Sequence, residues 1–196
     1  MKKKIAIFIS GRGSNMRAIA ENVKDGNLGD YCDIVLVFSN KSDAKGLETA
    51  QQMGFRTAAI ESRGKKRAEF EREVIDILRP LNIDYVVLAG FMRILSPLFI
   101  REYRERIINI HPADTAQYQG AHAYEWAFEN RMESTMITIH YVDEGVDTGQ
   151  VIAQRVVDLK GADTLEEVEK RGLKVEHQLY SETLVNLFRS VETRGE

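Results

Sequence analysis

The sequence predicts an α/β fold: a Rossmann-like, mostly parallel sheet with helices on both faces, an added antiparallel strand pair, and a long C-terminal helix that closes the structure. Three observations predict it. Short apolar runs alternate with helical patterns at βαβ spacing up to residue 110. Two β-rich runs then follow each other without a helical pattern between them. The last thirty or so residues carry one continuous helical periodicity.

The first half of the chain supplies the parallel sheet. Each predicted strand is a short, nearly continuous apolar run, which is typical of a strand buried on both faces; the runs cover residues 4–9, 33–38, 55–60, 84–89 and 107–110. Helical spacing of apolar residues predicts the intervening helices, and glycine or proline follows most of them; they cover residues 16–25, 43–53, 66–78 and 121–131.

The second half departs from this alternation. Residues 135–142 and 150–157 are rich in β-branched side chains and flank an acidic loop, so we expect an antiparallel pair attached to the sheet. Seven apolar residues between Leu165 and Val191 recur at helical spacing and predict one long amphipathic helix packed against the body. No repeat or linker interrupts the 196 residues, which suit a single domain.

Composition excludes several classes of protein. The net charge is −3 and the basic residues are not clustered beyond Lys2–Lys4, which argues against a nucleic-acid surface. A single cysteine, Cys32, excludes an intrachain disulfide and a cysteine-based metal cluster, and fits a reducing compartment. Residues 5–9 are too short for a signal core and no apolar run reaches the length of a membrane span. We therefore expect a cytoplasmic protein without a membrane partner.

A glycine-rich loop follows the first strand. Ser10-Gly11-Arg12-Gly13-Ser14-Asn15 joins that strand to the first helix, where glycines let backbone N–H groups approach an anion and the helix N-terminus favours negative charge. Ser14 or Asn15 could cap the helix. Position 16 is Met, so the loop lacks the third glycine of a dinucleotide fingerprint, and no Walker lysine follows. The alternatives are a monophosphate site and a tight turn that simply needs glycine.

The residues most suggestive of chemistry lie between 107 and 149. Asn109 and His111 stand two apart at the end of an apolar run, and the acidic loop 143–149 follows one hairpin later. An amide, an imidazole and a carboxylate at strand ends are what acyl-type transfer at a carbonyl requires: one group polarises the oxygen, one carries a proton, and one sets the pKa of the second.

The four histidines do not share one role. His111 is the functional candidate, because it follows a buried strand beside Asn109. His122 follows Gly120 in the next loop and is expected to support the site, whereas His140, on a strand, is interpreted as a structural histidine. His177 is expected to be structural or near the substrate rim. No pair has the spacing of a metal site, so no metal is expected.

Four motifs in this order and spacing resemble the glycinamide ribonucleotide formyltransferase family of the folate-dependent formyltransferase superfamily. They are residues 9–15, 89–96, Asn109-Ile110-His111-Pro112 and residues 142–149, and the resemblance covers nearly the whole chain. It implies transfer of the formyl group of 10-formyltetrahydrofolate, as co-substrate, to the glycyl amine of glycinamide ribonucleotide in purine biosynthesis. It also implies a phosphate-binding half, about 1–105, and a catalytic and folate-binding half, about 106–196.

The resemblance assigns roles by position. Asn109 and an imidazolium His111 would stabilise the formyl oxygen, and Asp147, rather than Asp143 or Glu144, would hold His111 and raise its pKa, so that activity should fall as His111 loses its proton. The ribonucleotide residues would be Gly13, Ser14, Asn15 and Glu176. The folate residues would be Arg67, Met92, Arg93, Ile94, Leu95, Asn109, Val142 and Asp143.

One segment departs from the family. Many members read Ser-Leu-Leu-Pro after the motif His-Pro, whereas this chain has residues 113–119 without that pattern, so the substrate contacts of the loop stay open. Two other functions also stay open: a formyltetrahydrofolate hydrolase, or a non-catalytic nucleotide-binding module. A formyltransferase acting on aminoacyl-tRNA is disfavoured by the charge and by the lack of a basic C-terminal domain. The expected partners are small molecules, with the chain a monomer or a homodimer.

Overall fold

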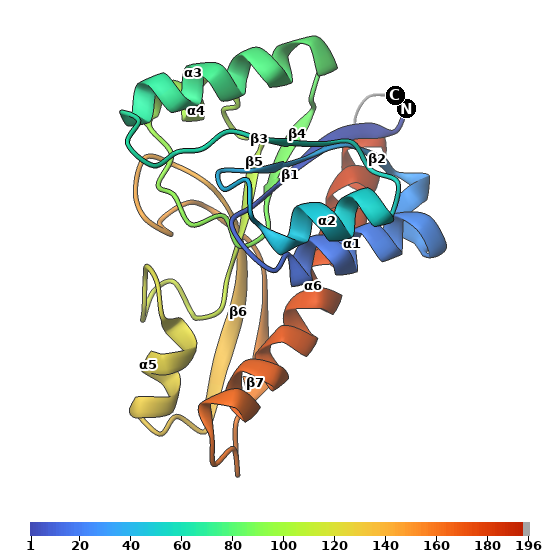
Figure 1. Cartoon of the computed structure of the whole chain (residues 1–196). Helices are drawn as coiled ribbons and strands as arrows, with labels where there is room; N and C mark the ends of the chain where they lie inside the picture. The colour runs from blue at the N-terminus through green and yellow to red at the C-terminus, as the bar shows by residue number, and fades with distance from the viewer. Residues whose placement is uncertain (194–196) are drawn as a thin grey trace.

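The computed structural model describes residues 1–193, which form one seven-stranded sheet with helices on both faces (Figure 1). The strand order is β3-β2-β1-β4-β5-β6-β7; the first five run parallel, and β6 and β7 are antiparallel additions. The strands are β1 Lys3–Ile9, β2 Cys32–Ser39, β3 Thr57–Ala59, β4 Tyr85–Leu88, β5 Ile107–His111, β6 Ser134–Tyr141 and β7 Val151–Asp158.

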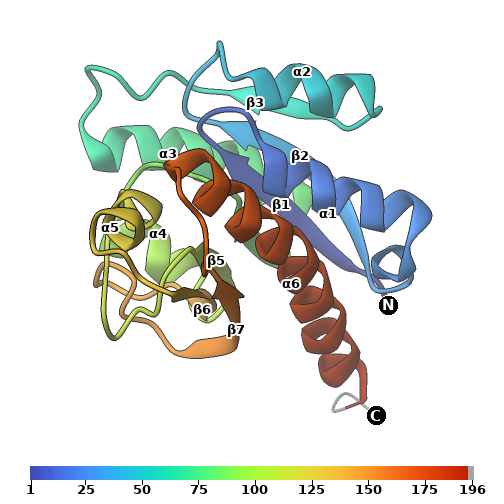
Figure 2. The same ribbon diagram turned by 90° about the horizontal axis from the view of Figure 1, so that it is seen from below.

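Two apolar layers hold the helices on the sheet. Alternate side chains of a strand point to opposite faces, so Ile5, Ile7 and Ile9 of β1 enter one layer while Ala6 and Phe8 enter the other. The first layer is covered by α1 Ser14–Asp25, α2 Lys45–Gln52, α5 Ala123–Glu129 and α6 Leu165–Thr193, with α6 lying beside α1 (Figure 2). The second is covered by α3 Arg67–Leu78 and α4 Pro97–Glu102.

The predicted fold class is confirmed, including the antiparallel pair and the long C-terminal helix. Two local predictions were wrong, and one helix was missed. The third strand is only Thr57–Ala59, α4 was not predicted, and neither Ser14 nor Asn15 caps α1. Gly13 precedes the helix instead, with φ 73°, and a side chain at that left-handed position would be strained. Short 3-10 segments, Asn27–Asp30 and Arg79–Leu81, also escaped prediction.

The strand order reverses at β1: β2 and β3 lie on one side of it in the sheet, and β4 and the later strands lie on the other. Ligands of open α/β sheets bind at such a switch point, outside the carboxyl ends of the strands. Ser10 ties the loops there together: its N–H donates to Gly90 O at 3.1 Å, its hydroxyl donates to Asn40 Oδ1 at 2.5 Å, and that hydroxyl accepts from the Met92 N–H at 2.7 Å. The loops after β1, β2 and β4 therefore meet.

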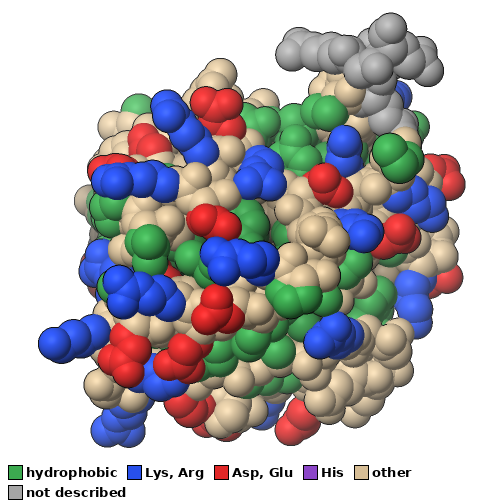
Figure 3. All heavy atoms as spheres, turned by 90° about the horizontal axis from the view of Figure 1, so that it is seen from above, with side chains coloured by type: hydrophobic (Ala, Val, Ile, Leu, Met, Phe, Trp, Pro, Cys, Tyr) green, Lys and Arg blue, Asp and Glu red, His purple; other side chains and the backbone are tan. Residues whose placement is uncertain are grey.

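The outer surface of α3 carries both signs of charge. Figure 3 shows Lys and Arg intermingled with Asp and Glu over this face, and Lys65 pairs with Glu73 while Arg79 pairs with Asp76 and Glu102. No helix within residues 1–193 combines the length and the apolar character needed to cross a bilayer.

A glycine inside α6 makes room for a tyrosine of α5. A Cβ built at Gly172 would overlap the ring and hydroxyl of Tyr124, whose hydroxyl donates a short hydrogen bond to Glu176 Oε1. Because glycine in a helix interior costs about 1 kcal/mol relative to alanine, its presence here reflects this close approach.

We expect Gly172→Ala to lower the free energy of unfolding by about 1–3 kcal/mol, as overpacking does, although alanine is the better helix former. Urea denaturation measures the change. In a Tyr124→Ala background the side chain that would clash is absent, so Gly172→Ala should not lower the free energy of unfolding there. A Gly172→Ala protein as stable as the parent would contradict this packing.

Candidate active site

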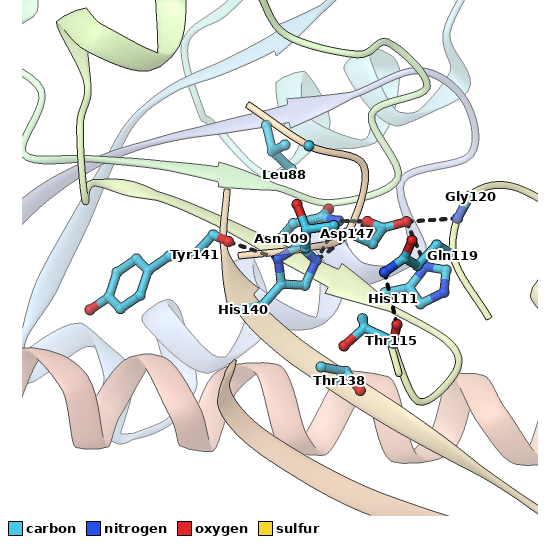
Figure 4. Close-up of polar contacts among 12 residues, drawn as sticks. Leu88, Asn109, His111, Thr115, Gln119, Gly120, Thr138, His140, Tyr141 and Asp147 are labelled. Carbon is cyan, nitrogen blue, oxygen red and sulfur yellow. Dashed lines mark hydrogen bonds and ion pairs between the residues drawn. The ribbon is translucent and has the colours of Figure 1, made fainter. Parts of the chain in front are cut away.

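The register of β5 and β6 gathers polar side chains on one side of the sheet. Asn109 and His111 are two residues apart on β5, so both point to the same face. In the antiparallel ladder Asn109 lies opposite His140 and His111 opposite Thr138, and directly opposed residues are neighbours on one face. Figure 4 shows the side chains of Asn109, His140 and His111 converging on Asp147.

The loop between β6 and β7 brings the Asp147 carboxylate into this group. Oδ1 accepts from Asn109 Nδ2 at 3.2 Å and lies 3.4 Å from His140 Nε2. Oδ2 accepts from the Gly120 N–H at 2.9 Å and lies 3.4 Å from His111 Nδ1. One carboxylate, with a side chain 12% exposed, thus joins two strands and two loops (Figure 4).

A tight turn presents Asp147 to its partners. Asp147 has φ 53°, a left-handed conformation that is uncommon for a residue other than glycine. Upstream, Asp143 Oδ1 accepts from the Gly145 N–H at 3.0 Å and from Thr148 Oγ1 at 2.6 Å. Asp143 and Glu144 are exposed, and Asp143 shapes the loop rather than contacting His111.

His111 is buried, and burial is the largest influence on its pKa. Desolvation lowers the pKa below its usual 6.5, while the Asp147 carboxylate and a hydrogen bond to Tyr118 O raise it and the His140 charge lowers it. The predicted effect of Asp147 is confirmed, since its carboxylate raises the pKa of His111, but the expected imidazolium was wrong, because burial lowers this pKa by more than the carboxylate raises it. The resting ring is neutral near pH 7.

Both ring nitrogens of His111 nevertheless face acceptors. Nδ1 lies 3.4 Å from Asp147 Oδ2, and Nε2 lies 3.0 Å from Tyr118 O. A ring that gains a second proton therefore finds an acceptor for each N–H. This arrangement suits a group that is neutral at rest and takes up a proton during a reaction.

Asp147 remains ionised under the same conditions. Burial on its own would raise its pKa, but hydrogen bonds from His140 and Gly120, with the charges of His111 and His140, hold the pKa below the usual 3.8. The site therefore keeps a fixed negative charge next to a neutral imidazole.

A cavity of about 410 Å³ opens beside these side chains, a size typical of small-molecule sites. Seven of the eight predicted folate residues line it: Met92, Arg93, Ile94, Leu95, Asn109, Val142 and Asp143. Arg67 does not line this cavity; it is exposed at the start of α3. Met92 and Ile94 are 73% and 53% exposed, so they present apolar surface to a ligand.

The predicted ribonucleotide residues form a second group next to the first. Gly13 and Ser14 line a cavity of about 420 Å³ with Arg12, Arg17 and His177. Asn15 Nδ2 donates to the buried Glu176 Oε2 at 2.5 Å, and the charge of Glu176 acts on the pKa of His111. Asn15 Oδ1 and His177 Nε2 are buried without a hydrogen-bond partner in residues 1–193.

Two histidines, His140 and His122, have contacts that differ from those predicted. His140, interpreted as structural, contacts both Asn109 and Asp147, and its Nδ1 lies 2.8 Å from Tyr141 O. The position of His140 next to Asn109 follows only from the register of β5 and β6. His122 lines the rim of the cavity, but it is exposed and pairs with Glu125 at 2.8 Å rather than with the Asp147 network.

The loop that departs from the family closes over His111. Tyr118 supplies the carbonyl at His111 Nε2, and its ring stacks on Trp126 with centroids 4.8 Å apart. Thr138 Oγ1 donates to Ala113 O at 2.7 Å, which fixes the start of the loop. Within residues 1–193, no group of three or more His, Cys, Asp or Glu side chains is arranged to hold a metal ion.

Comparison with known proteins identifies the family. Residues 3–184 match the formyl transferase family. The chain belongs to the formyl transferase family. It is 36% identical to phosphoribosylglycinamide formyltransferase of Bacillus subtilis, over 99% of this chain and 98% of that protein. It is 40% identical to the Escherichia coli protein of the same name, over 90% of this chain and 82% of that protein.

Solved formyltransferase structures share the fold. Phosphoribosylglycinamide formyltransferase from Streptococcus pneumoniae superposes with a TM-score of 0.87 at 40% identity, over 96% of this chain and 99% of that one. The trifunctional purine biosynthetic protein adenosine-3 of Drosophila pseudoobscura is 38% identical over 95% of this chain, which spans only 14% of its length.

The substitution Asp147→Asn should lower the pKa of His111 further. The carboxylate raises that pKa now, and the amide cannot. Titration of the His111 ring by NMR should give a midpoint below 6.5 in the parent and a lower one in the variant. An unchanged or higher midpoint in Asp147→Asn would refute this electrostatic assignment.

Proposed function

We propose that this formyltransferase transfers the formyl group of 10-formyltetrahydrofolate to the glycyl amine of N1-(5-phosphoribosyl)glycinamide. The products are formylglycinamide ribonucleotide and tetrahydrofolate, in de novo purine biosynthesis. The observation that carries the proposal is the Asp147-centred group of amide and imidazole at the mouth of one cavity, beside a glycine loop at a helix N-terminus. The names of full-length relatives support the same acceptor.

Asn109 would stabilise the negative charge that develops on the formyl oxygen when the amine attacks. Its side-chain amide has two N–H groups, and Asp147 Oδ1 accepts from Nδ2. The other N–H would donate to the oxyanion in place of its contact with His140 Nε2, which lies 3.3 Å from Nδ2. Because Asp147 fixes the orientation of the amide, this donor is positioned before the substrate arrives, which is the condition for effective oxyanion stabilisation.

His111 would carry the proton. The ring is neutral at rest, so it can accept a proton from the attacking nitrogen as the new C–N bond forms, directly or through water. It then returns that proton to the folate nitrogen as the old C–N bond breaks. Asp147 would stabilise the transient imidazolium, because its carboxylate lies 3.4 Å from Nδ1.

The two substrates would approach from different loops. The folate ring would lie against Met92–Leu95 and Val142–Asp143, where apolar side chains and backbone groups line the cavity. The phosphate of the acceptor would bind the N-terminus of α1 at Gly13, Ser14 and Asn15, and Glu176 would accept from a ribose hydroxyl. This assignment leaves Arg67 without a role in the cavity.

Formyl transfer is tested with purified protein, 10-formyltetrahydrofolate and the ribonucleotide, following loss of the formyl group. We expect turnover that depends on the acceptor. Equal turnover without acceptor would favour a formyltetrahydrofolate hydrolase, and nucleotide binding without turnover would favour a non-catalytic module.

Asn109→Ala and His111→Ala should each reduce kcat by about 10²–10³, the usual cost of losing one such group, while the far-ultraviolet circular dichroism stays unchanged. Asn186→Ala removes an exposed amide on α6 that bonds Arg189, and serves as the matched control with parental activity. Loss of less than tenfold in both active-site variants would remove them from the catalytic group.

A further inference from the structure

The wall of the cavity beside Asn109 and His111 is a short loop that α3 holds from beneath. Residues 91–95 follow β4, and all five line the cavity. Phe91 and Leu95 are buried in the second apolar layer, whereas Met92 and Ile94 point outwards. The backbone of this loop is held at its start, where the Met92 N–H donates to Ser10 Oγ at 2.7 Å, and a second anchor is needed at its other end.

Glu71 supplies that anchor from the buried face of α3. Its side chain is 1% exposed; Oε1 accepts from the Ser96 N–H at 2.7 Å and Oε2 accepts a short hydrogen bond from Ser96 Oγ. Across residues 1–193, no Lys, Arg or His side chain forms an ion pair with it. A buried carboxylate without a cation is costly for stability, so stability alone does not explain its presence.

Ser96 uses its hydroxyl in an unusual way. It stands immediately before α4, where serine ordinarily caps its own helix. Here the side chain makes no such cap and bonds Glu71 instead. The side chain at the end of the wall therefore bonds α3 rather than the N-terminus of α4.

A second contact holds the middle of the wall on the same turn of α3. The Arg93 guanidinium lies 4.9 Å from the ring centroid of Phe70, the residue before Glu71, and cation–π contacts of this kind contribute about 0.5–1 kcal/mol. Phe70 and Glu71 are adjacent on α3, so this helix contacts the loop at two points: Phe70 contacts Arg93, and Glu71 contacts Ser96. Displacing this turn would move the wall of the cavity.

We propose that Glu71 is a positioning residue for the formyl donor: through Ser96 it fixes the wall at 91–95 against which the donor binds. This inference rests on the proposed function, since that function assigns the wall to folate. Glu71 lies behind the wall and touches no reacting atom. Its loss should therefore weaken donor binding without altering the chemistry.

Three variants test the proposal in the full chain. Glu71→Leu removes both hydrogen bonds at similar volume; it should raise KM for 10-formyltetrahydrofolate about tenfold, the worth of about one charged hydrogen bond, with kcat and the ribonucleotide KM unchanged. Glu71→Gln keeps an acceptor for the Ser96 N–H and should stay within about threefold of the parent. Glu73→Gln, on the same helix but paired with Lys65, should match the parent. If Glu71→Leu does not fold, Ser96→Ala replaces it and should raise that KM about threefold, because only one bond is lost.

Hydrogen exchange on the ligand-free chain gives a readout independent of catalysis. Backbone amides of residues 92–96 should exchange about tenfold faster in Glu71→Leu, with the amides of β1 and β5 unchanged. Calorimetric titration with tetrahydrofolate alone should show the matching loss of affinity.

The outcomes separate the two proposals. A parent chain that transfers formyl while Glu71→Leu keeps its donor KM and its loop protection overturns the role of Glu71 alone. A fall in kcat with donor KM unchanged also overturns it. A parent chain that binds no tetrahydrofolate and transfers no formyl overturns the proposed function, and this inference with it.

Discussion

The carboxylate of Asp147 is the group on which the site depends. Its two oxygens contact four groups: the Asn109 amide of β5, the His140 ring of β6, the Gly120 N–H and the His111 ring. A half-buried carboxylate needs such donors, since without them its desolvation would be uncompensated. The same contacts that satisfy the charge also fix the amide and the imidazole, so local stability and reactive geometry have one physical origin.

The sheet explains why these groups can meet. Parallel strands deliver the loops after β1 and β4 to one edge, and Ser10 links those loops directly. The antiparallel strand β6 then places His140 directly opposite Asn109 in the ladder. Tyr180 of α6 covers the junction, with its hydroxyl at 2.9 Å from Leu88 O and 3.0 Å from Ile108 O. The helix thus braces the end of β4 and the strand β5, which carries Asn109 and His111.

The sequence predicted what depends on periodicity and local chemistry, and missed what depends on register and burial. The i, i+2 spacing of Asn109 and His111 is visible in the sequence, whereas the pairing of His140 with Asn109 requires the strand alignment. The effect of Asp147 on the pKa of His111 was predicted correctly, whereas the larger and opposite effect of burial was not visible in the sequence. The six-residue α4 escaped notice, since one and a half turns leave no periodic pattern.

The energetic coupling between His111 and Asp147 shows whether the carboxylate acts through the imidazole. Single-turnover rates of formyl transfer can be compared for His111→Ala, Asp147→Asn and the double variant. If the carboxylate acts through the imidazole, the effects of the two substitutions should be strongly non-additive: the double variant should be about as slow as His111→Ala alone. If the two losses multiply instead, Asp147 acts independently of His111, and the carboxylate-centred description of the site is wrong.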